Sequence, residues 1–196
     1  MSASIASGGS PFTATGSTNG IGAGASNAAG TLKVGLNTSA AGAYTAGSAM
    51  VSFKSQNADM ADQDLGGQSV TLKATVNYFA KPLFTLLSGY GLSGGGNSFT
   101  LDLGNLLAGS GPTHLQLGLA NAAQGGPQDG LRGAFDTSAV NDFAASGWGT
   151  VPDLAVGQML AGLFLDFNPL ALGLYTDSIV FHGLSFNESD PSGAAL

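Results

Sequence analysis

Two distant segments of this 196-residue chain carry one pattern at a constant spacing. Segment 32–46 aligns without gaps on 163–177, so that Asn37 falls on Asn168 and Tyr44 on Tyr175, an offset of 168 − 37 = 131. The same offset pairs Gly42 with Gly173, Thr45 with Thr176, and the upstream segment 12–16 with 143–147. After a one-residue slip, Ser48–Val51 falls on Ser178–Phe181. A repeat at a fixed spacing indicates two copies of one module. We therefore expect two domains, 1–80 and 81–196.

Each copy alternates apolar and polar or small residues, which is the period of a strand with one buried face. We predict two superimposable sets of core residues. The first set is Leu32, Val34, Leu36, Met50 and Val51, and the second is Leu163, Leu165, Phe167, Ile179 and Phe181. The shared Gly42 and Gly173 are predicted to adopt positive φ in the connection between two strands.

Short alternating runs continue along the chain and predict further strands. They lie at 69–79, 83–88, 98–103, 115–119 and 131–135. Segment 56–68 is predicted to be a polar loop, and 138–145 either a short helical turn or an irregular strand. No segment keeps a 3.6-residue period, and many short strands with Gly and Asn turns are typical of a sandwich. The predicted fold class is therefore all-β, with immunoglobulin-like β-sandwich modules.

The two predicted copies are incomplete at opposite ends. Only 31 residues precede Leu32, whereas 162 − 82 = 80 residues lie between Pro82 and Leu163. At the offset of 130, Leu196 corresponds to Gly66, so the second copy has no counterpart of the strand 69–79. A missing closing strand leaves an open apolar slot and an unpaired edge, which is a template for another chain. We expect a head-to-tail filament or array, with an excised fragment as the alternative.

Charge and composition exclude several classes of partner and site. Five cationic residues face twelve acidic ones, net −7, which argues against nucleic acid and against an anionic membrane surface. The chain has no Cys, which excludes disulfides and thiolate metal sites. No run of eighteen apolar residues could span a membrane. The first ten residues lack the basic and apolar regions of an export signal, so such a signal is not in this chain.

Two glycine motifs overlap in segment 89–95. Gly89, Gly91 and Gly94 fit a dinucleotide fingerprint, and Gly91-Leu-Ser93-Gly-Gly95 fits a nucleophile elbow. Both chemistries require a helix immediately afterwards, but a strand pattern follows, so we predict a turn. The only histidines are His114 and His182, and a Ser-His-Asp arrangement, or heme or metal ligation, would have to use one of them. Their spacing supports none of these.

Three acidic residues lie close together at Asp59, Asp62 and Asp64. They could gather around Ca²⁺, but their spacing matches neither the EF-hand loop nor the repeat of calcium β-rolls. A solvated acidic turn is the favoured interpretation, and calcium binding stays open. We therefore predict no catalytic, cofactor-binding or metal-ligating residues and no cofactor.

The sequence resembles a known bacterial family. TLKVGLNTSAAGAYTAGSAMVSFKSQ, at 31–56, and LGGQSVTLKATVNYFA, at 65–80, resemble the exported β modules called choice-of-anchor D. FTLDLGNLLAGS, LRGAFDTS and NESDPSGAAL resemble the companion part. The resemblance implies an immunoglobulin-like sandwich on a bacterial surface or extracellular-matrix protein, without shared catalytic residues. Segment 57–62 replaces the family's Gly-rich loop, and no anchor segment is present at the C-terminus.

These observations lead to one expected function and one alternative. The first is a non-enzymatic extracellular or cell-surface structural protein that self-associates, through β-strand edge pairing, into a filament or array. The alternative is an extracellular module that binds carbohydrate or a small molecule such as heme. A deep pocket lined by Tyr, Trp148 or His would favour the alternative. An enzyme would require His114 or His182 to lie within hydrogen-bond reach of Ser and Asp.

Overall fold

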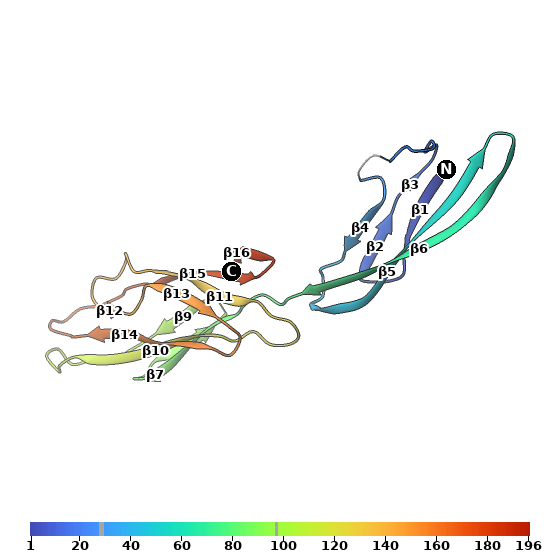
Figure 1. Ribbon diagram of the computed structural model, residues 1–196. Helices are drawn as coiled ribbons and strands as arrows, with labels where there is room; N and C mark the ends of the chain where they lie inside the picture. The colour runs from blue at the N-terminus through green and yellow to red at the C-terminus, as the bar shows by residue number, and fades with distance from the viewer. Residues whose placement is uncertain (28–29, 97) are drawn as a thin grey trace. The chain divides into compact units, whose positions relative to one another are not determined.

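A computed structural model describes residues 1–27, 30–96 and 98–196, and every regular element within these ranges is a β-strand. The chain divides into two compact units, Met1–Asn77 and Tyr78–Leu196 (Figure 1). The described residues contain no helix long and apolar enough to cross a membrane. The predicted all-β class is confirmed.

Unit 1 consists of one antiparallel sheet and one two-stranded ribbon. Its strands are β1 (Ser2–Ser7), β2 (Phe12–Thr15), β3 (Ser17–Thr18), β4 (Lys33–Leu36), β5 (Gly42–Asn57) and β6 (Met60–Val76). The sheet has the order β3-β1-β5-β6, and the ribbon pairs β2 with β4. Within the described residues, the buried apolar side chains of this unit are Ala3, Phe12 and Ala49. Unit 1 thus has a small core.

Unit 2 is a two-layer sandwich with an additional hairpin. Its strands are β7 (Pro82–Ser88), β8 (Leu92–Gly95), β9 (Ser98–Leu101), β10 (Thr113–Asn121), β11 (Gly130–Asp136), β12 (Ala144–Ser146), β13 (Thr150–Leu154), β14 (Met159–Phe167), β15 (Val180–Asn187) and β16 (Asp190–Ala195). One layer is β12-β14-β10-β7, the other is β13-β11-β15-β16, and β8 pairs with β9. The core lies between the layers, where Leu117 and Leu163 meet Leu131 and Val151.

The strands β11–β16 repeat the connections of β1–β6. The sheet orders correspond strand by strand, and β2-β4 corresponds to the pair β12-β14. The registers correspond as well. Thr13 pairs with Gly35 as Ala144 pairs with Asp166, at an offset of 131. Ile5 pairs with Val51 as Phe135 pairs with Phe181, at an offset of 130. The two-copy interpretation stays a prediction, which these registers support.

The matched tyrosines also make matched contacts. The Tyr44 hydroxyl donates to the Ala40 carbonyl at 2.9 Å, and the Tyr175 hydroxyl donates to the Ala171 carbonyl at 2.8 Å. The prediction of positive φ at Gly42 and Gly173 is wrong, because neither has it. A Cβ would lie 3.3 Å from the Tyr44 ring at Gly42 and 3.6 Å from the Tyr175 ring at Gly173. The glycines therefore leave room for a ring that folds back over the backbone.

The predicted core is wrong for part of the first set and right for most of the second. Val34 and Met50 are both 47% exposed, and Leu32, Leu36 and Val51 are half-buried. In the second set Leu163, Leu165 and Phe167 are buried, while Ile179 and Phe181 are half-buried against the core. The difference has a plain cause. Strand β14 continues its layer through β10 to β7, whereas β4 pairs with β2 alone in the described chain.

The predicted loop at 56–68 is also wrong, because these residues form the end of a long hairpin. Strands β5 and β6 are joined by a turn at Ala58 and Asp59, and Figure 1 shows the tip of this hairpin standing clear of the other strands of the unit. The Asn57 side chain accepts the Asp59 N–H at 3.1 Å, as Asn187 accepts the Ser189 N–H at 2.9 Å between β15 and β16. The polar composition reflects strands exposed on both faces.

The remaining expected strands are present with shifted ends. Predicted strand 69–79 is the second half of β6, which ends at Val76, and 98–103 is β9, which ends at Leu101. Predicted strands 83–88, 115–119 and 131–135 lie within β7, β10 and β11. Segment 138–145 resolves into a turn followed by the short strand β12. Its irregular-strand interpretation is therefore the better of the two that the sequence left open.

Candidate binding cleft

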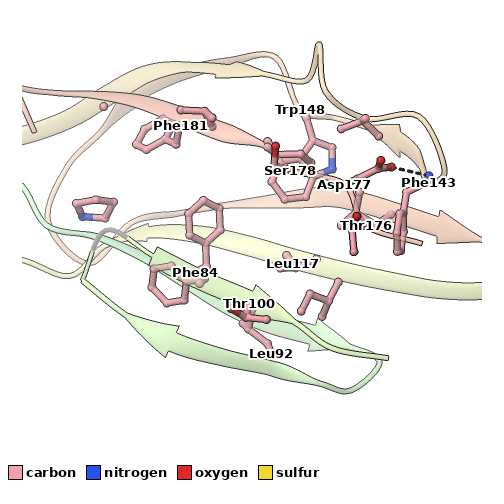
Figure 2. Close-up of a pocket in the computed structure, with 18 of the residues that line it drawn as sticks. Phe84, Leu92, Thr100, Leu117, Phe143, Trp148, Thr176, Asp177, Ser178 and Phe181 are labelled. Carbon is pink, nitrogen blue, oxygen red and sulfur yellow. Dashed lines mark hydrogen bonds between the residues drawn. The ribbon is translucent and has the colours of Figure 1, made fainter. Parts of the chain in front are cut away.

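Unit 2 contains an apolar cleft of about 570 Å³ between its two layers. One wall comes from β7 and the β8–β9 hairpin, and the other from the segment 175–179 and β15 (Figure 2). Aromatic side chains dominate the lining, namely Phe84, Phe99, Phe143, Trp148, Tyr175 and Phe181. A cleft of this size and character is typical of a binding site for an apolar group.

Ring contacts hold the cleft walls in place. Phe84 stacks on Trp148 with ring centroids 6.3 Å apart and meets Phe99 edge-on at 5.2 Å. Trp148 in turn meets Phe135 edge-on at 5.0 Å, and its indole N–H donates to the Phe164 carbonyl at 2.8 Å. Because the polar atom of Trp148 is satisfied by β14, its ring can stay at the edge of an apolar cleft. The aromatic lining is therefore largely pre-formed.

Asp177 is the single charged side chain among the described residues that line the cleft. One of its carboxylate oxygens accepts the backbone N–H groups of Asn141, Asp142 and Phe143, at 3.0, 2.8 and 2.9 Å. Figure 2 shows the bond to Phe143. Burial raises the pKa of Asp177, but the three backbone bonds together outweigh it and leave the pKa below its usual value. The carboxylate thus ties the chain before β12 to the cleft and gives the cleft a negative charge.

One border of the cleft is a segment without backbone partners, residues 171–179, which leads into the start of β15 at Val180. No backbone hydrogen bond joins the N–H groups of residues 171–179 to another backbone group in the described chain. Strand β16 pairs with β15 only from Leu184 onward, and beyond that Leu196 donates to the Gly183 carbonyl at 3.1 Å. Within the described chain, the N–H groups of 171–179 therefore have no backbone partner, and neither does the edge of β15 from 180 to 182 that faces away from β11.

The glycine motifs begin in a bend and continue into a strand beside the cleft. Gly89, Gly91 and Gly94 all have positive φ, but the predicted turn is wrong for 92–95, because Gly94 lies within β8, which pairs with β9 in place of a helix. At Gly91 a Cβ would lie 2.0 Å from the Asp102 carbonyl oxygen, so a close backbone approach requires glycine there. Segment 89–95 therefore supplies no helix N-terminus for a phosphate, and Ser93 lies on β8 rather than on the strand-to-helix turn of a nucleophile elbow.

The histidines lie outside the cleft. His114 Nδ1 is 2.6 Å from the Asp166 carboxylate across the β10–β14 pair, with the His114 side chain 70% exposed. His182 lies on β15, exposed and in line with Ala134 of β11. In the described part of the chain, no serine hydroxyl hydrogen-bonds to either ring. The His114–Asp166 pair therefore does not form a Ser-His-Asp triad.

The three neighbouring aspartates spread along the β5–β6 hairpin. Asp59 lies in the turn, and Asp62 and Asp64 lie on β6, with Asp64 directly opposite Lys54. Over residues 1–27, 30–96 and 98–196, no three His, Cys, Asp or Glu side chains converge on a common point.

The sequence singled out Trp148 but not the rest of the cleft. Phe84, Phe143 and Tyr175 come from separate parts of the chain, and nothing in their spacing indicates that they meet. One comparison within the sequence could have pointed to Asp177. The matched position in unit 1 is Ala46, so the carboxylate is present in unit 2 alone.

No family model, curated protein or solved structure matches the chain. The cleft and the free strand edges are thus the features from which its function is inferred.

Proposed function

We propose that the chain is a non-enzymatic structural protein of the bacterial cell surface or extracellular matrix that self-associates by pairing of strand edges. The observation that carries this proposal is the outer edge of β6, a 17-residue strand that is last in its sheet and pairs only with β5 among the described strands. A long exposed edge presents unpaired N–H and C=O groups to other chains.

The second half of β6 suits such pairing better than the first. The first half carries Asp62 and Asp64, whose charges oppose association, whereas the span 67–76 carries only Lys73. Val70 in this span is 47% exposed, and no proline interrupts the strand. If β6 of one copy pairs with a different free edge of the next copy, the two contacting surfaces are not the same. Repeated head-to-tail contacts of this kind build filaments or arrays. The resemblance to choice-of-anchor D modules supports the extracellular location.

Light scattering and negative-stain electron microscopy of the purified chain test this proposal. We expect concentration-dependent assemblies that a Val70→Lys variant weakens at least tenfold, because a charge on an edge strand opposes pairing. Leu107→Lys is the matched control, since Leu107 is 78% exposed in a turn outside any strand and its replacement should leave assembly unchanged. A monodisperse monomer at millimolar concentration would contradict the proposal.

A second candidate function, a ligand-binding module, is favoured by the cleft itself, because Trp148 and Tyr175 line it. The lining suits neither heme nor carbohydrate well. Heme carries two propionates, which would meet Asp177 without any cationic partner in the described lining. A sugar needs several hydrogen-bonding groups, and the walls are mostly aliphatic and aromatic. Trp148 is the only tryptophan, so its fluorescence reports directly whether either ligand enters the cleft.

A further inference from the structure

The segment without backbone partners that borders the cleft of unit 2 has a paired counterpart in unit 1. There, β5 pairs with the second half of β6 along the segment that matches the free edge in unit 2. Tyr44 lies opposite Ala74, Ser48 opposite Thr71 and Ala49 opposite Val70. At the offsets of 131 and 130, the acceptor residues Tyr44, Ser48 and Ala49 correspond to Tyr175, Ser178 and Ile179. In unit 1, the second half of β6 thus pairs with the segment that corresponds to the border of the unit 2 cleft.

The strand in that place has a distinct pattern. Leu72, Ala74 and Val76 are half-buried in unit 1, while Lys73 and Thr75 between them are exposed. In unit 2 the corresponding apolar wall is larger, because Ile179 and Phe181 stand where unit 1 has Ala49 and Val51. If a further strand with apolar residues at alternate positions paired here, its apolar side chains would be buried in the cleft. Its backbone would hydrogen-bond to the unpaired N–H and C=O groups of the edge.

Charge restricts the occupant further. Unit 2 carries nine acidic and two cationic residues, 2 − 9 = −7, whereas unit 1 carries three of each. The described lining of the cleft includes Asp177 and no Lys or Arg. An acidic segment would therefore be repelled, and a neutral or basic segment favoured.

We propose that the unit 2 cleft binds an extended segment of a separate polypeptide as an added β-strand, with small or medium apolar residues at alternate positions and a neutral or positive charge. The segment pairs with residues 172–182, and its apolar side chains enter between Phe84 and Phe181. This is recognition by β-augmentation, in which backbone bonds give affinity and alternate side chains give specificity. The site proposed here is the 172–182 edge, whereas the self-association proposal rests on the outer edge of β6. Peptide binding at 172–182 can therefore be found even if the chains do not assemble.

The first experiment adds the synthetic peptide QSVTLKATVN, the sequence of residues 68–77, to the full-length chain. We expect a change in Trp148 emission and at least tenfold slower hydrogen exchange of the alternate amides in 172–182 that face the added strand, because these amides gain partners. The same peptide with Leu72→Asp should lose binding, and Lys73→Glu should weaken it several-fold at low salt. A peptide with Thr75→Ser is the matched control and should bind like the parent.

The second experiment determines the register with a disulfide. The chain has no cysteine, so Ser178→Cys introduces a single thiol. In unit 1 Ser48 lies opposite Thr71, whereas Thr75 lies opposite Ala43. A peptide with Thr71→Cys should therefore couple to the Ser178→Cys chain at least tenfold faster than a peptide with Thr75→Cys, because directly opposed residues bring their Cβ atoms within disulfide range.

Three results would overturn the proposal. The first is unchanged exchange at 172–182 with no register preference in the coupling. The second is a small apolar probe that shifts Trp148 emission when the peptide does not, which makes the cleft a small-molecule pocket. The third is concentration-dependent protection of 172–182 without peptide, together with coupling between Ser178→Cys and Thr71→Cys chains, which makes a second copy the occupant. Register-selective coupling of the peptide to chains that remain monomeric supports the proposal even if self-association fails.

Discussion

Leu165 and Val34 hold matched positions in β14 and β4, yet only Leu165 is buried. The sequence pattern is the same in both strands, because alternation reports which face of a strand is apolar and not whether anything covers that face. Strand β10 and the opposite layer cover Leu165, while β4 has no second neighbour in the described chain. How much an apolar residue of this pattern contributes to the free energy of unfolding thus depends on strands that are far away in the sequence.

This difference leads to a prediction for unit 2. Leu165→Ala should lower the free energy of unfolding by about 2–5 kcal/mol, because it removes buried contacts and leaves a cavity. Leu172→Ala is the matched control, since Leu172 is 93% exposed, and its effect should stay within about 0.5 kcal/mol. Urea unfolding followed by Trp148 fluorescence measures both. Equal losses for the two variants would contradict the assignment of Leu165 to the core.

Asp177 gives a prediction about pH. Its pKa in the folded chain is lowered by the backbone bonds from Asn141, Asp142 and Phe143, which outweigh the opposite effect of burial. A carboxyl group with a lowered folded pKa stabilises the fold above its unfolded value, about 3.9, and this contribution is lost as pH falls through the folded pKa. Wild type should therefore exceed Asp177→Asn in urea midpoint at pH 6, and the difference should shrink below about pH 4. A difference that stays constant from pH 6 to pH 2.5 would show that the carboxylate is not the cause.

At the scale of elements, a buried polar cluster joins the end of β10 to its neighbours. The Asn121 side chain donates to the carbonyls of Asp129 and Leu154, at 3.0 and 3.2 Å, and accepts the N–H groups of Lys81 and Ala123, at 3.1 and 3.3 Å. The side chain is fully buried, so water cannot readily replace these bonds. One residue thus holds four chain segments together.

We predict that Asn121→Ala destabilises unit 2 by about 2–4 kcal/mol, because it leaves buried donors and acceptors without partners. The matched control is Gln128→Ala, which removes one exposed bond to the Gly125 carbonyl and should cost less than about 0.5 kcal/mol. Both values come from urea unfolding monitored at Trp148. An Asn121→Ala variant as stable as the control would mean that the cluster is replaced by water at no cost.

The elements differ in how far the sequence predicts them. Strands β10 and β14 are predicted well, because one face is buried and alternation results. The β5–β6 hairpin tip is not, because residues from Asn57 to Gln68 are exposed on both faces and carry no periodic signal. The sequence predicts the residues that line the cleft least well of all. The walls of the cleft join β7, the β8–β9 hairpin, Trp148 and β15, and only the packing of the two layers brings these together.

At the scale of the whole chain, the two units differ in the size of their cores. Among the described residues, unit 1 buries three apolar side chains, and two of them are alanines. Unit 2 buries eleven, including seven leucines. Because hydrophobic stabilisation scales with the apolar area removed from water, unit 1 has much less to oppose the entropy of its chain.

The final prediction is that the two units unfold in separate transitions, with unit 1 first. Far-UV circular dichroism should show a loss of strand signal at low urea that Trp148 fluorescence does not detect, because Trp148 lies in unit 2. Amides of β1 and β5 should exchange at least a hundredfold faster than those of β10 and β14, which lie in the larger core. Phe12→Ala should shift only the first transition, and Leu165→Ala only the second. If both probes report one coincident transition that both variants shift together, the units are a single cooperative body.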